Sequence, residues 1–508
     1  MTPSNDLFEL IKSMSRKEKI HFTLHTKHTG GAKAKNYLTL FNAISRQNIY
    51  DELAIKTAMG KSKKGESFSV MKNYLHNLVL DHITNYHYEN HRGYRVKEYF
   101  RKAQMLYDKN LLNQSLKYVQ KAKKIASSEH RYIDLISILQ LEENISKIHY
   151  SIQQYETTFN QNFEYELNTI NQYYNTRQYI YLDCQLLNAI RNTDNFTDGK
   201  SNKPILSILN HPLLSNEHNA ISLYSGIYFN TINGIGYHIL DEEEKSYVYR
   251  KNLVELMEGN TLETSPYIGN YIVALTNLTS TEFNLHKYAD GLSSINKIKT
   301  TLKKYDHLLV ERIKTLATTS IILNMTTYFG YFGKSGDIEL HLQEVEKTIS
   351  IQSKKMDPRF VVHILYSLAY LAFKIENYDK AFQFLQQLIN FPTGQIDKYI
   401  QRGYRLLLLM VHLEMRNFRL LQYMAINTYR YLLKSGELTR YDKIIINFLK
   451  HKTIDKAALY KLHTSLLEIK SNKFEAKEFT HLDVISWVES KIEKLPFLEV
   501  YRKNNMIS

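Results

Sequence analysis

The amino-acid sequence predicts an all-α protein in which helical hairpins stack into an extended α-solenoid. The stretch Leu365–Pro392 places apolar residues on one face of each of two helices, with a polar break between them. The same spacing of small and apolar residues recurs between Tyr99 and Ala122. The internal prolines fall at the ends of periodic segments, where they do not interrupt a helix. A hairpin cannot bury its apolar faces alone, so we expect neighbouring hairpins to complete one another's core.

Residues 1–92 differ from the rest of the chain and predict a small N-terminal helical domain. Four short apolar periodicities are followed by a basic turn, Gly60–Gly65, and by a long helix that begins near Ser67. Ser15 with Glu18 three residues later is a capping box, which marks the start of the second short helix. This order of elements indicates a helix-turn-helix or winged-helix fold.

Six polar residues of this domain are candidate contacts to nucleic acid or to another acidic partner. In a helix-turn-helix arrangement, the cations of the basic turn contact phosphates and a polar helix face approaches a groove. The candidates are Lys61, Lys63 and Lys64 in the turn and Lys72, Asn73 and His76 on the long helix. The alternative is that all six are solvated residues on the first layer of the solenoid, because the sequence shows no firm turn signature and no pair of wing strands.

From residue 93 onward the sequence predicts two stacks of hairpins. Residues 93–195 form the first stack, and its last part, Tyr150–Ile190, predicts two helices that are rich in Tyr, Asn and Gln. These residue types are indifferent helix formers, so tertiary packing must hold the two helices. Residues 196–217 contain two prolines and predict a long connection with at most one helical turn, at Ile205–Leu209.

The second stack occupies residues 218–480, and a capping helix with a tail follows at 481–508. Apolar periodicity and proline positions predict six hairpins, at about 218–257, 266–303, 307–352, 360–391, 396–433 and 437–471. Asp337 and Asp357 are the predicted N-caps of two of their helices. The last helix has an apolar face and a charged opposite face, as the end of a repeat array requires.

The stretch Leu365–Pro392 resembles a tetratricopeptide repeat. Ala369 and Ala381 provide the small residues of that pattern and Pro392 closes the unit, whereas Glu376 stands where the turn usually has glycine. The resemblance implies a helical solenoid that binds proteins or peptides in its concave groove.

Three further stretches resemble a group of uncharacterised bacterial helical-repeat proteins. They are Leu7–Ser13 near the N-terminus, Lys72–Leu75 on the long helix and Leu482–Lys491 near the C-terminus. This resemblance extends over nearly the whole chain, and it implies a helical-repeat architecture without implying an activity.

Phosphate-binding loops are not predicted, although Gly-Lys-Ser occurs three times, at Gly60, Gly199 and Gly333. Such a loop needs another glycine five residues earlier, directly after a strand, so that backbone amides wrap the phosphate. None of the three sites meets either condition. We therefore expect no nucleotide cofactor.

Other reactive side chains also favour a protein that is not an enzyme. His21, His25 and His28 can share a helix face, but a zinc site needs a third or fourth ligand held in place. Cys184, the only cysteine, lies in a predicted helix interior, where we expect a buried structural thiol. We predict no catalytic, cofactor-binding or metal-binding residue.

The net charge and the cysteine content limit which partners and which cellular compartment we expect. Lys+Arg 66 against Asp+Glu 51 gives a formal net charge of +15, which favours acidic partners, nucleic acid among them. A lysine bias spread over a solvated surface gives the same total. One cysteine excludes an intrachain disulfide and fits a reducing cytoplasm. The apolar run Leu406–Leu413 is too short to span a bilayer, so we expect no membrane partner.

These observations predict a cytoplasmic, non-catalytic scaffold that binds a protein or peptide partner in the solenoid groove. The repeated hairpins and the lack of catalytic motifs support this prediction. The alternative is a regulatory protein in which residues 1–92 bind nucleic acid and the tetratricopeptide-like solenoid senses a signal.

Overall fold

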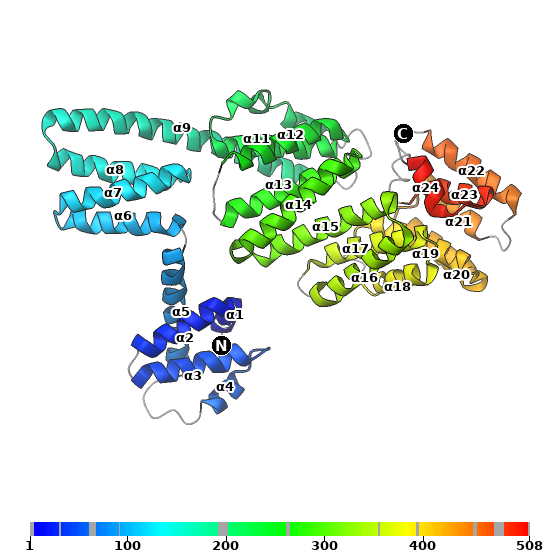
Figure 1. Cartoon of the computed structure of the whole chain (residues 1–508), viewed down its shortest axis with the longest axis horizontal. Helices are drawn as coiled ribbons and strands as arrows, with labels where there is room; N and C mark the ends of the chain where they lie inside the picture. The colour runs from blue at the N-terminus through cyan, green and yellow to red at the C-terminus, as the bar shows by residue number, and fades with distance from the viewer. Residues whose placement is uncertain are drawn as a thin grey trace. The chain divides into compact units, whose positions relative to one another are not determined.

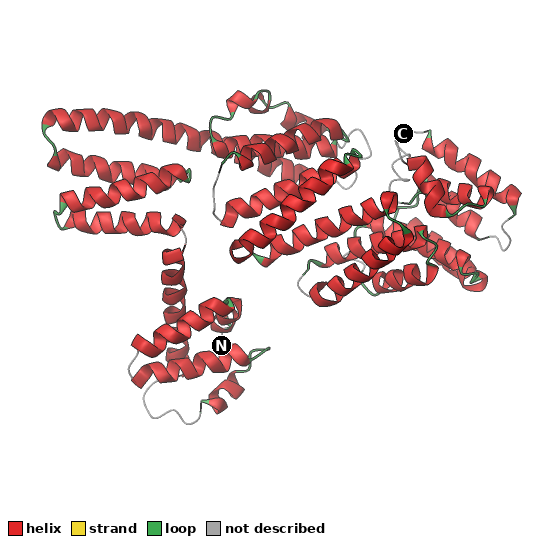
Figure 2. Ribbon diagram, in the orientation of Figure 1, coloured by secondary structure: helices red, strands yellow, loops and turns green. Residues whose placement is uncertain are grey.

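The computed structural model of the chain describes residues 5–29, 32–59, 68–90, 92–191, 202–260, 265–353, 356–392, 396–450, 455–471 and 482–505. Within these residues every regular element is a helix, and no strand is present (Figure 2). The prediction of an all-α protein is confirmed, and helices pack against their neighbours in the sequence as in a helical-repeat solenoid. The chain divides into two compact units, Met1–Tyr174 and Asn175–Ser508, each with its own core.

The first unit begins with four short helices and one long one, in the predicted order (Figure 1). Helices α1 to α5 close around an apolar core that includes Ile11, Phe22, Leu40 and Val79. The helices of this unit are α1 (Asp6–Ser13), α2 (Arg16–Thr29), α3 (Ala32–Arg46), α4 (Glu52–Ala58), α5 (Phe68–Asn90), α6 (Arg92–Asp108), α7 (Leu112–Ser128), α8 (Tyr132–His149) and α9 (Ile152–Arg191), the last of which continues into the second unit.

Helices α6 and α7 form the first hairpin, and α8 packs against it. Ala103 and Ala122 are fully buried where the helices meet, and the Ser115 hydroxyl donates a hydrogen bond to the Ala103 carbonyl at 2.7 Å. Small residues allow such a close approach because interiors are packed without spare volume. The spacing noted in the sequence is thus a packing requirement of the hairpin.

The second unit continues the pattern with further hairpins. Its helices are α10 (Lys203–Leu209), α11 (Leu223–Ile239), α12 (Glu243–Glu258), α13 (Ser265–Asn284), α14 (Tyr288–Tyr305), α15 (Glu311–Phe332), α16 (Ser335–Gln352), α17 (Pro358–Lys374), α18 (Tyr378–Ile389), α19 (Lys398–Glu414), α20 (Phe418–Lys434), α21 (Arg440–Leu449), α22 (Lys456–Lys470), α23 (Val484–Glu493) and α24 (Phe497–Asn505). Short 3₁₀ helices lie at Pro212–Leu214, Glu217–Asn219 and Asp306–Leu308. The first helices of successive hairpins, α13, α15, α17, α19 and α21, also pack on one another in order.

Many of the turns between consecutive helices share one backbone conformation, although the turn between α15 and α16 does not, since Gly333 there has a φ of −69°. In the turn after α17, Glu376 has a φ of 61° and the next amide, of Asn377, donates to the Ala372 carbonyl at 3.0 Å. This bond satisfies a carbonyl that the helix end leaves without a partner. The same positive φ, followed by an amide that bonds five residues back, occurs at Asn110, His130, Asp241, His286, Arg416, Gly436 and Lys494. The recurrence shows that one hairpin geometry repeats along both units.

Helix α23 still packs on α22, its neighbour in the sequence, but α24 packs on α15 and α17. Residues 482–505, which we call the C-terminal clasp, turn back onto helices formed much earlier in the chain. The Asp483 amide donates to the Tyr370 hydroxyl at 2.8 Å, and the Phe497 ring lies 5.7 Å from the ring of Phe373. The Arg502 guanidinium donates to carbonyls at the end of α15, at 3.0 Å to Gly330. The clasp therefore ties α15 and α17 to the C-terminus.

The clasp covers a buried lysine on α17. The Lys374 ammonium lies 3.5 Å from the centre of the Tyr501 ring and 4.3 Å from that of Tyr370. Burial lowers the pKa of Lys374 to about 7, and the neighbouring Asp483 only partly opposes this. The aromatic faces offer the ammonium a partial substitute for water.

Two sequence predictions about helix lengths are wrong. The connection predicted at 196–217 has more than one helical turn, because α10 spans seven residues, Lys203–Leu209, and a 3₁₀ helix follows it. Tyr150–Ile190 does not form two helices, because α9 is a single helix of 40 residues. The segment contains no proline or glycine, so no residue breaks it. Its many polar residues do not mark a break either, since several of them contact α7 and α8.

The two predicted N-caps have different outcomes. The Asp357 carboxylate accepts a hydrogen bond from the Arg359 amide at 2.9 Å, which confirms this cap at the start of α17. The prediction of Asp337 is wrong, because α16 begins at Ser335 and Lys334 is its N-cap residue. Asp337 lies in the first turn, where its charge still complements the helix dipole.

Candidate partner-binding groove

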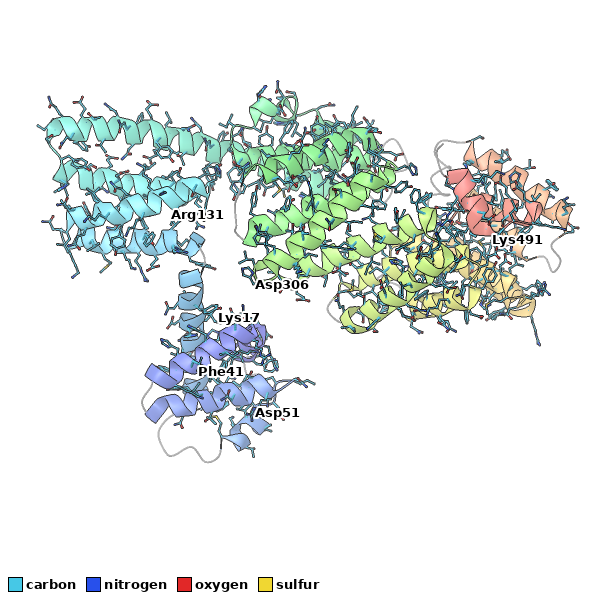
Figure 3. All side chains as sticks on the ribbon, in the orientation of Figure 1. Lys17, Phe41, Asp51, Arg131, Asp306 and Lys491 are labelled. Atoms are coloured by element: carbon cyan, nitrogen blue, oxygen red, sulfur yellow. The ribbon has the colours of Figure 1, made fainter. Side chains whose placement is uncertain are left out.

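An open groove lies between α2 and α3 in the first unit. Its volume is about 420 Å³, and its floor is the ring of Phe41, which is only 2% exposed. That ring lies 4.6 Å from the ring of Phe22 in the core (Figure 3 labels Phe41). The lining residues are Arg16, Lys19, Ile20, Thr23, Leu24, Phe41, Asn42 and Ser45. The groove is therefore built on a rigid base.

The start of α2 places two cations at one end of the groove. The predicted capping box is confirmed, because the Ser15 amide donates to the Glu18 carboxylate at 2.6 Å and the Glu18 amide donates to the Ser15 hydroxyl at 3.3 Å. This cap sets the helix start, so that Arg16 and Lys19 lie in the first turn. The charges of these cations add to the positive end of the helix dipole. A bound anion would be attracted by both the cations and the dipole.

Apolar side chains follow the two cations along the α2 side of the groove. Ile20 and Leu24 lie one turn apart on α2 and are 51% and 52% exposed. Covering two such side chains recovers about 25 cal/mol for each Å² of apolar surface removed from water. A ligand with an apolar group is thus favoured here.

The two cations at the groove, Arg16 and Lys19, form no ion pair within the described part of the chain, whereas Lys12 donates to the Ser45 carbonyl at 3.0 Å. Burial lowers the pKa of Lys19, and the neighbouring Lys12 lowers it further. The Glu18 carboxylate acts to raise the pKa of Lys19, but the effects that lower that pKa outweigh it. A carboxylate in the groove would stabilise both charged side chains.

This arrangement selects a ligand by two features. The apolar floor and wall accept one large side chain, and the adjacent guanidinium and ammonium accept carboxylates, with the guanidinium able to bind in a bidentate manner. A protein segment with an apolar residue beside Asp or Glu provides both. A nucleic-acid backbone provides the negative charge and leaves Ile20 and Leu24 uncovered.

Three of the predicted nucleic-acid contacts, Lys72, Asn73 and His76, lie on α5 and are not among the residues that line the α2–α3 groove. Lys61, Lys63 and Lys64 lie outside the described residues. Asn73 is exposed and His76 is half-buried, and both are on α5. The structure does not place either of them in the groove between α2 and α3.

Lys72, the remaining predicted contact, is used inside the first unit. Its ammonium donates to the Tyr50 hydroxyl at 2.6 Å and lies 3.3 Å from the Glu52 carboxylate. Burial acts to lower the pKa of Lys72, but the contacts with Tyr50 and Glu52 outweigh burial and raise it. This charge is largely neutralised within the fold.

The histidines of α2 meet a third histidine from α5. His21 Nδ1 and His82 Nε2 are 2.7 Å apart, a hydrogen bond, and the His25 ring lies 5.1 Å from the His82 ring. Burial lowers the pKa of His82 to about 4, with smaller contributions from His21 and His25. The side chain of His28 lies outside the described residues. Among the side chains that the structure describes, no three of His, Cys, Asp or Glu are arranged to hold a metal ion.

The prediction of a buried thiol at Cys184 is wrong. The side chain is exposed on α9, because its neighbours Leu182 and Leu186 take the buried side of the helix. Gly333 ends α15 as its C-cap and is not part of a phosphate-binding loop. The other two Gly-Lys-Ser motifs, at Gly60 and Gly199, lie outside the described residues.

The groove residues could have been found by a closer count of helical positions. Ile20, Phe22 and Leu24 are separated by two residues each, and on a helix the middle one points about 200° away from the first. All three cannot face one core. Phe22 is buried, so the pair Ile20 and Leu24 had to remain at the surface beside Arg16.

No family model matches this chain, and neither the curated proteins nor the solved structures contain a match. None of the helices in the described ranges combines the length and the apolar character needed to cross a membrane.

Proposed function

We propose that the chain is a non-catalytic helical-repeat protein that binds a protein partner, and that the α2–α3 groove receives one segment of that partner. The observation that carries the proposal is the combination in one groove of two cations, Arg16 and Lys19, with exposed Ile20 and Leu24 over Phe41. The segment has a large apolar residue flanked by Asp or Glu. The same proposal includes the solenoid groove that the sequence predicts, as a second surface that binds the protein partner.

We also propose that the hairpins are tetratricopeptide-like and that the protein acts in the cytoplasm. Ala369 and Ala381, the small residues of that repeat pattern, are both fully buried on α17 and α18. An exposed free thiol at Cys184 fits a reducing compartment. The resemblance to bacterial helical-repeat proteins supports both proposals.

A displayed library of random peptides tests the groove. The library is selected on the immobilised full-length chain, and enriched peptides are then measured against the variant Arg16→Glu/Lys19→Glu. We expect enriched sequences to share a large apolar residue next to Asp or Glu. Their affinity should fall at least about tenfold for the variant, since two attractive charge contacts become repulsive, a change of at least 1.4 kcal/mol.

The matched control is Lys117→Glu/Lys124→Glu, which makes the same change in net charge at exposed positions on α7. It should leave peptide affinity within about twofold of the wild type, a difference expected of distant surface charges. Peptides without acidic residues, or equal binding to both variants, would show that the groove does not select this class of partner.

Nucleic-acid binding by the N-terminal helices is a second candidate function. Arg16, Lys17 and Lys27 are exposed on α2, and the sequence adds three further cations, Lys61, Lys63 and Lys64, to the same N-terminal residues. Labelled duplex DNA and RNA, titrated at several salt concentrations, test this. We expect Lys61→Ala/Lys63→Ala/Lys64→Ala to weaken binding and flatten the salt dependence, while Lys72→Ala has little effect because Glu52 already neutralises that charge. No binding at low salt contradicts the candidate.

A further inference from the structure

Helix α9 is held in the first unit by its polar side. Lys123 on α7 donates to the Asn162 side chain at 3.0 Å, and Asn162 in turn donates to Glu142 on α8 at 3.2 Å. The Tyr165 hydroxyl donates to the Ser127 hydroxyl at 2.7 Å. A surface helix usually turns its apolar side inward. Helix α9 has the reverse arrangement along this part of its length.

The opposite side of α9 is apolar and exposed. Phe163, Leu167, Ile170 and Tyr174 are between 42% and 64% exposed. Their spacing of four, three and four residues places them on one face of the helix. Phe159 extends the same face by one turn, and its ring stacks on that of Phe163 at 6.2 Å. A contiguous exposed stripe of this kind marks an interaction surface.

The stripe is symmetric along the helix. Counting outward from a point between residues 166 and 167, Phe163 corresponds to Ile170 and Phe159 to Tyr174. Leu167 lies beside that point. Phe163, Ile170, Phe159 and Tyr174 therefore each have an apolar counterpart at the same distance on the other side, whereas Leu167 corresponds to Glu166. In a two-fold contact residue i of one copy meets residue j of the other, so the stripe is complementary to itself.

The charges on the same face follow the same symmetry with opposite sign. Glu156 and Arg177 are each exposed on α9 and lie equally far from the central point. In an antiparallel pair of α9 helices each Glu156 meets an Arg177. A parallel pair would place Glu156 against Glu156, which is repulsive. Ile152 and Tyr181, exposed at the two ends of the stripe, correspond in the same way.

We propose that α9 pairs in antiparallel orientation with α9 of a second copy of this chain, with the two-fold axis beside Leu167. The paired segment, Ile152–Tyr181, is about 44 Å long at 1.5 Å per residue. Most residues between the stripe and the packed side are Asn, Gln or Thr. The charged exceptions near the axis are Glu164 and Glu166, and Glu166 accepts a hydrogen bond from Gln140 of its own copy at 3.0 Å. The pairing uses a surface separate from the α2–α3 groove and does not depend on the function proposed for it.

Sedimentation velocity of the full-length chain over a concentration series tests the pairing. We expect the wild type to form a reversible dimer and Phe163→Glu/Ile170→Glu to remain monomeric. The matched control is Met105→Glu/Ile133→Glu, which places the same charges on exposed apolar positions of α6 and α8 and should leave the dimer intact. Arg16→Glu/Lys19→Glu should also dimerise normally, which separates this result from that of the groove.

Charge exchange tests the orientation. Glu156→Arg alone and Arg177→Glu alone should each weaken the dimer at least about tenfold, because the pair occurs twice in a two-fold assembly and 1.4 kcal/mol is tenfold. The variant with both substitutions should recover wild-type affinity. These surface variants leave the core unchanged, so they give an answer even if the double-glutamate variant does not fold.

Disulfide trapping in a Cys184→Ser background provides an independent check of orientation. Leu167→Cys should cross-link to itself. Tyr174→Cys should cross-link only when mixed with Phe159→Cys. A monomer at every concentration, a dimer that survives Phe163→Glu/Ile170→Glu, or self-cross-linking of Tyr174→Cys would each overturn the proposal.

Discussion

Helices α9 and α24 both carry aromatic side chains on one face, yet only α24 buries them within its own unit. Phe497 of α24 is 1% exposed and Arg502 donates to carbonyl groups at the end of α15. Phe163 of α9, also a helical phenylalanine, is 52% exposed. The apolar residues alone do not explain the difference.

The two helices differ in where their hydrogen-bonding partners lie relative to the apolar face. The Gly330 carbonyl lies in the last turn of α15, and the Arg502 guanidinium donates to it, as it also does to the Phe329 carbonyl, which already accepts from the Gly333 amide. The side chains of α7 that hydrogen-bond to α9 contact the side of that helix away from its apolar face, at Asn162 and Tyr165. Position of the hydrogen-bonding groups thus decides which face of a helix is covered within the chain.

Truncation of one phenylalanine in each helix gives the largest expected contrast. Phe497→Ala removes a fully buried ring and should lower the free energy of unfolding by about 3–5 kcal/mol. Phe163→Ala, measured at dilution, should change it by less than about 0.5 kcal/mol, as expected at an exposed site. Denaturant titration followed by fluorescence of Trp487, the single tryptophan and a buried residue of the clasp, measures the first. Equal losses would remove the distinction between the helices.

Replacement of the lysine under the clasp should stabilise the second unit. The pKa of Lys374 falls from its usual 10.5 to about 7 on folding, so the unfolded chain binds more protons between these values. Stability therefore rises as pH increases from 7 toward 10.5, and below pH 7 the full cost of the buried charge remains. Lys374→Met should add on the order of a few kcal/mol at neutral pH. Lys374→Met should also abolish the increase in the free energy of unfolding between pH 7 and 10.5, measured by Trp487 fluorescence. If the variant keeps that increase, another group causes it.

The first unit should respond to pH in a different window. The folded pKa of His82 is about 4 against 6.5 for an ordinary histidine, so the unfolded chain again binds more protons between these values. Stability is lost as pH falls from 6.5 to 4, on the order of 1–2 kcal/mol after allowance for screening by solvent. Urea titration followed by circular dichroism measures the transition that Trp487 does not report. His82→Leu should show a smaller loss over this range, and an unchanged loss would contradict the assignment to His82.

A substitution in a hairpin turn should have the smallest effect. Arg416 has a φ of 59°, a left-handed conformation that costs a residue with a Cβ about 1–2 kcal/mol. Arg416→Gly should raise the free energy of unfolding by about 0.5–1 kcal/mol, because relief of this strain outweighs the additional chain entropy that glycine loses on folding. Gly436→Ala, in the turn with a φ of 71°, is the matched opposite and should lower it by a similar amount. Changes of the same sign would show that the turn conformation is not the cause.

The local elements of this fold could be predicted from the sequence. Ser15 with Glu18 gave the start of α2, and Asp357 before Pro358 gave the start of α17. The small residues Ala369 and Ala381 marked the close contact between α17 and α18. Each of these signals lies within a few residues of the feature it predicts, because capping and hairpin packing are short-range interactions.

The features that combine distant segments could not be predicted. The groove requires Phe41 of α3 beneath Ile20 and Leu24 of α2, and no periodicity within one helix specifies that contact. The interaction of Arg502 with Gly330 spans 172 residues. The partner of His82 is His21, 61 residues earlier, although the sequence had grouped His21 with His25 and His28.

The clasp has a consequence for the order in which the chain matures during synthesis. Most hairpins contact only their neighbours, so each can form soon after it leaves the ribosome. Tyr370, Lys374 and Gly330 acquire these partners only from residues 483–502, and two of the contacts join residues 113 and 172 positions apart in the chain. Until then this part of the nascent protein exposes aromatic rings and unsatisfied carbonyls, and a ribosome that stops early releases a product that never covers them.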